Sequence, residues 1–266
     1  MIDLSEHLVV VRGGGDLGSG VIWRMRRVGF PVVVLELERP LSVRRTVSYS
    51  SAITEGSILI DGIEGVRVAS PEEAIEVADH GSVPVLLSRE IPRFPISVIV
   101  DARLAKRNLG TTMGQAPFVV ALGPGFSAGS DCHAVVETMR GHRLGRVIWD
   151  GSAAPNTGVP GEIGGASAER VLRAGSGGEL VWTASFGDLV EPGQSLGTID
   201  GAPVRAKIGG TVRGLLLPGP VTPGLKIGDI DPRCDPSALR QISDKARSIG
   251  GGVLEAVLVW IGGETR

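Results

Sequence analysis

The feature that most constrains the fold of this 266-residue chain is an internal repeat in its second half. Arg173-Ala-x-x-Gly-Gly-x-Leu180 recurs as Arg205-Ala-x-x-Gly-Gly-x-Val212, and Glu191-Pro-Gly-x-x-x-Gly-x-Ile-Asp200 recurs as Thr222-Pro-Gly-x-x-x-Gly-x-Ile-Asp231. A unit this short cannot bury its own apolar face, so we expect the two copies to pair about a pseudo-twofold axis. Short apolar runs alternating with glycine turns predict a small all-β domain.

One segment of the repeat resembles a known domain family. Gly187–Leu196, GDLVEPGQSL, is similar to a run found in biotinyl and lipoyl domains, which implies a barrel-sandwich hybrid. Those domains carry a modified lysine on the hairpin that follows. Here Thr198–Val204 leads straight into the second copy and Lys207 lies beyond the expected turn, so we expect no swinging lysine arm.

The first half of the chain alternates strand and helix patterns. Apolar runs at His7–Val11, Pro31–Glu36, Val83–Leu87, Ile96–Val100 and Phe118–Leu122 alternate with helical patterns at Asp16–Val28 and from Ser70 onward. This order predicts a Rossmann-like, mostly parallel α/β sheet covered on both faces. We therefore expect a Rossmann-like domain over residues 1–165, a β domain over 166–235, and a tail over 236–266 with a helix at Pro236–Ile249 and a strand at Val253–Ile261.

The composition excludes several classes of protein. A hydrophobic content of 42% with a net charge of −2 fits a globular chain, and no basic excess is present to bind nucleic acid. No apolar run reaches the roughly 18 residues of a membrane helix, and no signal peptide is recognisable. Two distant cysteines predict a reducing, cytoplasmic location without a disulfide framework.

A glycine fingerprint follows the first strand. Gly13-x-Gly15-x-x-Gly18 lies between a strand and a helix, and Glu36 ends the next strand, as in dinucleotide-binding motifs. Asp16 departs from that pattern, because an acid repels a pyrophosphate unless it points away or caps the helix. The alternative is a turn of the same shape that binds nothing.

Two further segments are expected at the same edge of the sheet. Asp101 follows a strand and precedes Arg103 and Lys106, and the turn with Gly123, Gly125 and Gly129 follows the next strand. Ligands bind beyond the carboxyl ends of parallel strands, so these residues and the fingerprint predict a shared site for a nucleotide or another oxyanion. The alternative is a solvated basic helix face that Asp101 caps.

The trio Asp131, Cys132 and His133 is expected at the start of a helix near Ser130. A helix N-terminus stabilises a thiolate, so Cys132 is a candidate nucleophile or sulfur carrier that His133 could assist. A metal site with His142 is a weaker alternative, since adjacent helical residues point apart and no second cysteine lies nearby; we expect no metal. Cys132 as a buried core residue is the third alternative.

Several of these motifs together resemble one protein family. Gly13–Gly20, Arg44-Arg45-Thr46, Asp101–Gly110, Gly123–Glu137 and Val147–Ser152 on to Gly161 are similar to the accessory proteins of the selenium-dependent molybdenum hydroxylase system. The resemblance implies a cytoplasmic role in maturing a molybdenum hydroxylase, with that enzyme or other maturation proteins as partners. It places the family's Asp-Cys-His trio on Asp131, Cys132 and His133.

Three functions follow from these patterns. The first is a maturation factor that binds a nucleotide or molybdopterin-type cofactor and handles sulfur or selenium through Cys132. The second is an NAD(P)-dependent oxidoreductase. The third is a non-catalytic adaptor with a vestigial nucleotide-binding fold. The sequence decides neither whether the chain is an enzyme nor whether it forms a homo-oligomer.

Overall fold

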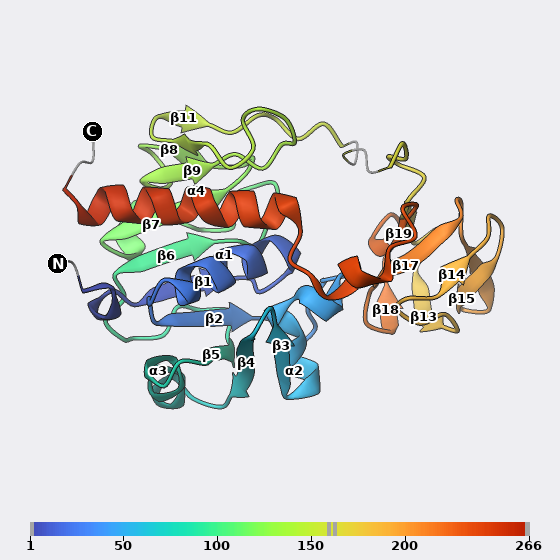
Figure 1. Ribbon diagram of the computed structural model, residues 1–266, viewed down its shortest axis with the longest axis horizontal. Coiled ribbons are helices and arrows are strands. Elements are labelled where there is room, and N and C mark those ends of the chain that lie inside the picture. The colour runs from blue at the N-terminus through green and yellow to red at the C-terminus, as the bar shows by residue number, and fades with distance from the viewer. Residues whose placement is uncertain (1–2, 159–160, 162–163, 264–266) are drawn as a thin grey trace. The chain divides into compact units, whose positions relative to one another are not determined.

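The computed structural model describes residues 3–158, 161 and 164–263 and divides the chain into two compact units (Figure 1). The first unit comprises Met1–Pro40, Val47–Asn156 and Ile242–Arg266, and the second comprises Leu41–Thr46 and Thr157–Gln241. The boundaries expected at residues 165 and 235 therefore differ from those of the structure: the C-terminal helix belongs to the first unit, and the second unit includes a distant segment. Residues 159–160, near the end of the Val147–Gly161 run that contributed to the family resemblance, lie outside the described residues.

The first unit is built on a sheet that has nine strands within the described residues, in the order β10-β9-β7-β6-β1-β2-β5-β4-β3. These strands are β1 (Val9–Arg12), β2 (Val32–Glu36), β3 (Ser57–Ile60), β4 (Ile63–Val68), β5 (Val83–Leu87), β6 (Val98–Asp101), β7 (Phe118–Leu122), β9 (Ala134–Val136) and β10 (Val147–Ile148). A separate pair joins β8 (Ser127–Ala128) to β11 (Gly151–Ser152).

The predicted fold class, a Rossmann-like domain plus a barrel-sandwich hybrid, is wrong as stated. The large sheet is mixed, because β3 pairs antiparallel with β4 at one edge and β10 pairs antiparallel with β9 at the other. The sequence pattern did not reveal these short edge strands, since a hairpin strand and a buried parallel strand look alike in runs of two to four residues.

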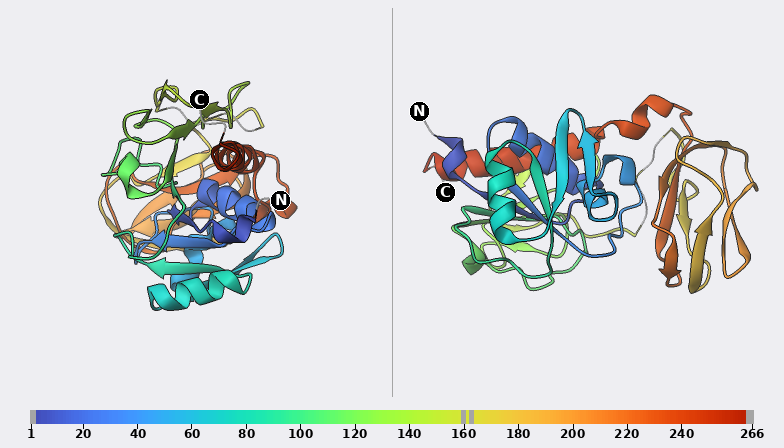
Figure 2. Two further views of the ribbon diagram at one scale, coloured as in Figure 1. Left: turned by 90° about the vertical axis from the view of Figure 1, so that its left-hand side faces the viewer. Right: turned by 90° about the horizontal axis from the view of Figure 1, so that it is seen from below.

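The helices are α1 (Asp16–Arg27), α2 (Ala52–Glu55), α3 (Pro71–Asp79) and α4 (Asp244–Ile261), with 3-10 turns at Leu4–Glu6, Arg45–Val47, Tyr49–Ser51, Met113–Gln115 and Pro236–Arg240. Helices α1 and α4 lie side by side on one face of the sheet (Figures 1 and 2) and share a core with alternate residues of β1. Helix α3 packs on the other face and follows Ser70, where the sequence predicted a helical pattern to begin; the Ser70 side chain accepts the N–H of Glu73. No helix in the described part of the chain is long and apolar enough to cross a membrane.

The tail is a single long helix, so the predicted strand at Val253–Ile261 is wrong, and the helix expected from Pro236 begins only at Asp244. Gly250-Gly251-Gly252 looks like a helix break in the sequence, yet α4 runs through it. A Cβ at Gly250 would lie 2.4 Å from the carbonyl oxygen of Gly20 on α1. The glycines therefore let two helix backbones approach closely, and the packing outweighs their poor helix propensity.

The helix expected at Ser130 is also absent. After the glycine turn the chain forms β8, a tight turn and then β9, which pairs parallel with β7. In that turn the Asp131 carboxylate accepts the N–H of Ser127 at 2.8 Å, and the N–H of Asp131 donates to the Ser127 carbonyl at 2.8 Å. This local bonding replaces a helix cap, and the β-branched Val135 and Val136 favour a strand.

The second unit consists of two four-stranded antiparallel sheets, in the orders β12-β19-β17-β14 and β16-β15-β13-β18. The strands are β12 (Val171–Arg173), β13 (Gly178–Trp182), β14 (Leu189–Val190), β15 (Ser195–Ile199), β16 (Ala202–Arg205), β17 (Gly210–Leu215), β18 (Gly219–Val221) and β19 (Lys226–Asp231). The internal repeat is visible in this order, because each sheet takes its central strands from one copy and its outer strands from the other.

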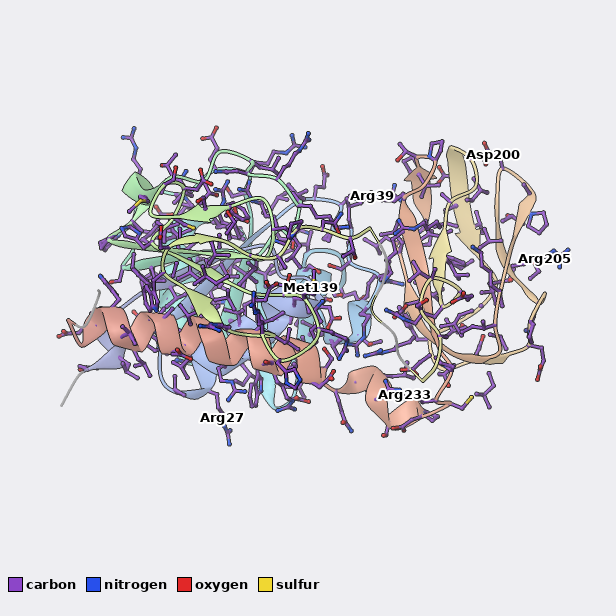
Figure 3. All side chains as sticks on the ribbon, turned by 90° about the horizontal axis from the view of Figure 1, so that it is seen from above. Arg27, Arg39, Met139, Asp200, Arg205 and Arg233 are labelled. Atoms are coloured by element: carbon purple, nitrogen blue, oxygen red, sulfur yellow. The ribbon has the colours of Figure 1, made fainter. Side chains whose placement is uncertain are left out.

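Reciprocal hydrogen bonds tie the two copies together. Arg173 of the first copy donates to the carbonyl of Gly224 at 3.0 Å, and Arg205 of the second copy (Figure 3) donates to that of Gly193 at 2.8 Å. The distant segment adds to this unit, since the N–H of Leu215 donates to the carbonyl of Val43 at 2.8 Å. Neither copy can complete its sheet alone.

We predict that Gly250→Ala lowers the free energy of unfolding by about 1–3 kcal/mol, as expected when a side chain is forced into a packed contact. Gly251→Ala is the matched control, because its Cβ would meet nothing within 4 Å and alanine is the better helix former by about 1 kcal/mol. Urea unfolding of both variants checks this, and equal effects would contradict the close contact of α1 and α4.

Candidate functional site

The candidate site lies where the strand order of the large sheet reverses. Strands β2 to β5 lie on one side of β1, and β6, β7 and β9 lie on the other, so β1 and β6 flank the point at which the chain changes direction. Parallel sheets bind ligands beyond the carboxyl ends of the strands at such a point. Those ends are Arg12 on β1 and Asp101 on β6, which are register partners.

Four side chains form a hydrogen-bonded group here, which we call the Asp101 cluster: Arg12, Asp101, Arg103 and Thr111. Arg103 pairs with the Asp101 carboxylate, with its Nη2 at 2.5 Å from Oδ2. The Thr111 hydroxyl donates to the same carboxylate at 2.6 Å and accepts from Arg103 at 3.0 Å and from Arg12 at 3.3 Å. One proton donated and two bonds accepted use the whole capacity of a hydroxyl group.

Electrostatics keep Asp101 ionised. Its side chain is buried, and burial raises the pKa of a carboxyl group. The hydrogen bonds and the charge of Arg103, together with the Thr111 hydroxyl, outweigh burial, so the pKa of Asp101 lies below its ordinary value. The cluster therefore contains one carboxylate and two guanidinium groups.

Arg12 is the unusual member of the cluster. Arg12 is only 9% exposed, and among the described residues Thr111 is the one hydrogen-bond partner of its side chain. Burial lowers the pKa of Arg12, the nearby Arg103 charge lowers it further, and Asp101 opposes both. A guanidinium group has five N–H donors, so most of its capacity is unused by the protein.

The glycine fingerprint forms the turn next to the cluster. Gly13 has a φ of +101°, and a Cβ there would lie 3.0 Å from the carbonyl oxygen of Ala102. Gly15 is the N-cap of α1, Asp16 is its first residue, and Gly18 packs against the Gly13 carbonyl. Gly13 and Gly18 thus have the close contacts that such a turn requires.

Glu36 holds the same turn. Its two carboxylate oxygens accept the N–H groups of Gly14 and Leu37, each at 2.8 Å. Burial raises the pKa of Glu36, and these two bonds only partly offset the effect. Glu36, which the sequence placed at the acidic position of a dinucleotide-binding motif, thus holds the backbone of the turn.

The second glycine turn touches the loop after Asp101. Gly125 has a φ of +105°, and a Cβ there would lie 2.5 Å from the backbone nitrogen of Arg107. Lys106 is exposed in that loop, while Gly123 packs against Thr138 and Gly129 lies at the far end of the turn. The structure therefore brings together the loops after β1, β6 and β7.

Cys132 lies in the core and not in an open site. Its residue is fully buried, on the same face of the sheet as Val10 and Ile99. Burial, followed by the charge of Asp131 and a smaller effect of Asp101, raises the pKa of Cys132 to about 12. The predicted thiolate therefore lacks both its helix N-terminus and a favourable environment.

His133 and Glu137 act on the backbone and not on Cys132. The Nδ1 atom of His133 accepts the N–H of Val119 at 3.0 Å, which requires a neutral ring, and burial lowers the pKa of His133. Glu137 is buried and accepts the N–H groups of Thr138, Met139 and Ala154 at 2.7–2.8 Å. The structure assigns neither residue to a metal: within its described residues no group of histidine, cysteine and acidic side chains could hold one, and His142 is an exposed loop residue.

Sequence reasoning missed Arg12 and Thr111. Arg12 had a usable signal, since a charge that ends a fully apolar strand next to a glycine turn is unusual in a buried position. Thr111 had none, because it joins the cluster only through the path of the loop that begins at Asp101.

No family model matches the chain. The chain is 45% identical over 258 residues to "Uncharacterized protein YqeB" of Escherichia coli (strain K12), which covers 96% of this chain and 48% of the relative. The chain thus spans about half the length of that relative.

Solved structures match only loosely. A succinylglutamate desuccinylase/aspartoacylase from Rhodobacter sphaeroides has 14% identity and a TM-score of 0.21, covering 83% of this chain and 51% of that one. The ectoine utilization protein EutE (DoeB) from Ruegeria pomeroyi has 12% identity and a TM-score of 0.24, covering 84% and 56%. An aspartoacylase family protein from Mesorhizobium loti has 14% identity and a TM-score of 0.29, covering 84% of each chain. We draw nothing about the function of this chain from scores this low.

The comparisons correct the family and function expected from the motifs. The relative that matches 96% of this chain is named as uncharacterized, and its name gives no link to molybdenum, selenium or hydroxylase maturation. The assignment to the molybdenum hydroxylase accessory proteins is therefore withdrawn, and with it the predicted functions of maturation factor and NAD(P)-dependent oxidoreductase. The physical reason lies in the motifs, whose acids Glu36, Asp101 and Glu137 all hold local backbone or loops.

We predict that Asp101→Asn destabilises the fold by about 1–3 kcal/mol at neutral pH, because it removes the buried charge that accepts hydrogen bonds from Arg103 and Thr111. The ionised form of Asp101 adds stability above the ordinary pKa of 3.8, and this contribution disappears as the pH falls through the lowered folded-state pKa. The variant should therefore lose less stability than the wild type between pH 7 and pH 3 in urea unfolding. Asp79→Asn, at an exposed position, is the control.

We predict that Ellman's reagent titrates one thiol in the native protein and two in denaturant. Both cysteines are free, Cys234 is exposed and Cys132 is buried, so only Cys234 should react quickly. Cys234→Ser should abolish the native reaction. Rapid native labelling of that variant would contradict the buried position of Cys132.

Proposed function

We propose that the first unit binds a small anionic ligand at the Asp101 cluster, and that Arg12 is the group that holds the anion. The observation that carries the proposal is that Arg12, a residue only 9% exposed, makes a single side-chain hydrogen bond of 3.3 Å among the described residues, while its other N–H groups are not fully enclosed by the protein and can meet a ligand. A charge that is largely removed from water and has few protein partners is stabilised by an ion of opposite charge that pairs with it.

The surroundings of Arg12 support an anion as that missing partner. Arg12 and Arg103 carry two positive charges, and Asp101 supplies one negative charge, so the cluster has an excess of one positive charge. A guanidinium group offers parallel N–H donors that match the oxygens of a carboxylate or phosphate. The position at the reversal of strand order is also where ligands of parallel sheets bind.

The proposal covers a defined class of ligands. Carboxylates and phosphate-bearing molecules, nucleotides included, present oxygens of the required kind. The free thiols of Cys132 and Cys234 support the cytoplasm as the location in which the protein meets such a ligand.

We predict that Arg12→Gln weakens anion binding by about ten- to a hundredfold, which corresponds to the loss of charge-assisted hydrogen bonds of about 1.5–3 kcal/mol. Thermal shift assays with acetate, phosphate, sulfate and nucleotides measure the effect, because a ligand that binds only the folded state raises its melting temperature. Arg12→Lys keeps the charge without the planar fork and should recover part of the binding.

Arg27→Gln is the matched control. Arg27 extends from the last turn of α1 into solvent (Figure 3), so this variant makes the same charge change on the surface. Equal anion binding by the wild type and Arg12→Gln, with circular dichroism showing both to be folded, would contradict the proposal.

A further inference from the structure

The charges around Arg12 restrict what the ligand can be, if the proposed anion site holds. We infer that the group bound at the Asp101 cluster is a singly charged oxyanion, a carboxylate or a phosphodiester, and not a doubly charged phosphate or sulfate. This inference rests on the proposed function and specifies the ligand for the same site.

The charges of the Asp101 cluster leave a single positive charge for the ligand to balance. Arg103 is already committed to Asp101, with its Nε and Nη2 on the two carboxylate oxygens, and its Nη1 donates to the carbonyl of Leu109 at 3.3 Å. That pair is close to neutral. The positive charge that remains belongs to Arg12, and one negative charge on the ligand balances it.

Besides Arg12 and Arg103, the Asp101 cluster contains no buried cation within the residues that the structure describes. Thr111 contributes a hydroxyl group whose proton and lone pairs are all in use. Lys106 and Arg107, in the same loop, are exposed, so water and salt screen their charges. Neither can balance a second ligand charge as a buried group would.

The acids nearby disfavour a second negative charge on the ligand. Asp101 is 1% exposed and Glu36, at the end of the neighbouring strand β2, is 9% exposed. A doubly charged ligand would place an unbalanced negative charge near two buried carboxyl groups, where repulsion is much stronger than in water. A singly charged ligand avoids that repulsion.

The experiment compares three small anions with the full-length protein at one ionic strength and pH 8. Acetate and dimethyl phosphate are singly charged, planar and tetrahedral respectively, and sulfate is doubly charged and tetrahedral. Each is titrated in thermal shift assays against the wild type and Arg12→Gln. The difference between the two proteins removes the general stabilisation that sulfate gives to any folded protein.

We expect the Arg12-dependent affinity for acetate or dimethyl phosphate to exceed that for sulfate by about tenfold or more, a factor that corresponds to 1.4 kcal/mol. The better of the two singly charged anions identifies the source as a carboxylate or a phosphodiester. Asp101→Asn adds one positive charge to the cluster and should shift the preference toward sulfate, provided that circular dichroism shows the variant to be folded.

The outcomes distinguish failure of the charge restriction from failure of the anion site. Arg12-dependent binding of sulfate as tight as that of the singly charged anions would overturn the charge restriction and leave the anion site standing. No Arg12-dependent binding of any of the three would overturn the anion site itself.

Discussion

Buried carboxylates at the ends of strands organise the edge of the first unit at which the candidate site lies. Glu36 holds the turn after β1, Asp101 holds the loop after β6, and Glu137 holds the segments that follow β9. A buried carboxylate is stable only when donors surround it, so each acid determines the path of the backbone near it. Without these anchors, the loops that bring Arg12 and Arg103 together would have no fixed arrangement.

Close backbone contacts are the second constraint on this unit. The Gly20 and Gly250 contact lets α1 and α4 cover one face of the sheet together, and the Gly125 contact seats the turn after β7 against the loop after β6. In each case a side chain on the glycine would collide with the backbone of the opposing segment. A glycine in the sequence is equally consistent with a flexible backbone and with a close packing contact. Only the residue that lies opposite the glycine in the structure distinguishes the two.

The second unit shows a different route from sequence to structure. Its two sequence copies exchange strands, so each sheet is completed by the other copy, and paired arginines close the equivalent turns. The segment Leu41–Thr46 adds backbone bonds from far away in the sequence, including the bond from Leu215 to Val43. The repeat was visible in the sequence because equivalent turns need equivalent glycines. The contribution of Leu41–Thr46 to this unit was not visible in the sequence.

The sequence by itself determined the elements whose signals are local. Strands β2, β5 and β7, helix α1 and the Ser70 cap of α3 follow from apolar runs and capping residues. Only the tertiary structure decided that the Ser130 segment is a turn and strand, that the triple glycine continues a helix, and that Cys132 is buried while the Arg12 side chain makes a single hydrogen bond. The physical reason is that the free energy of a cysteine thiol, a guanidinium or a helical glycine depends on what surrounds it. Those surroundings come from residues far away in the chain.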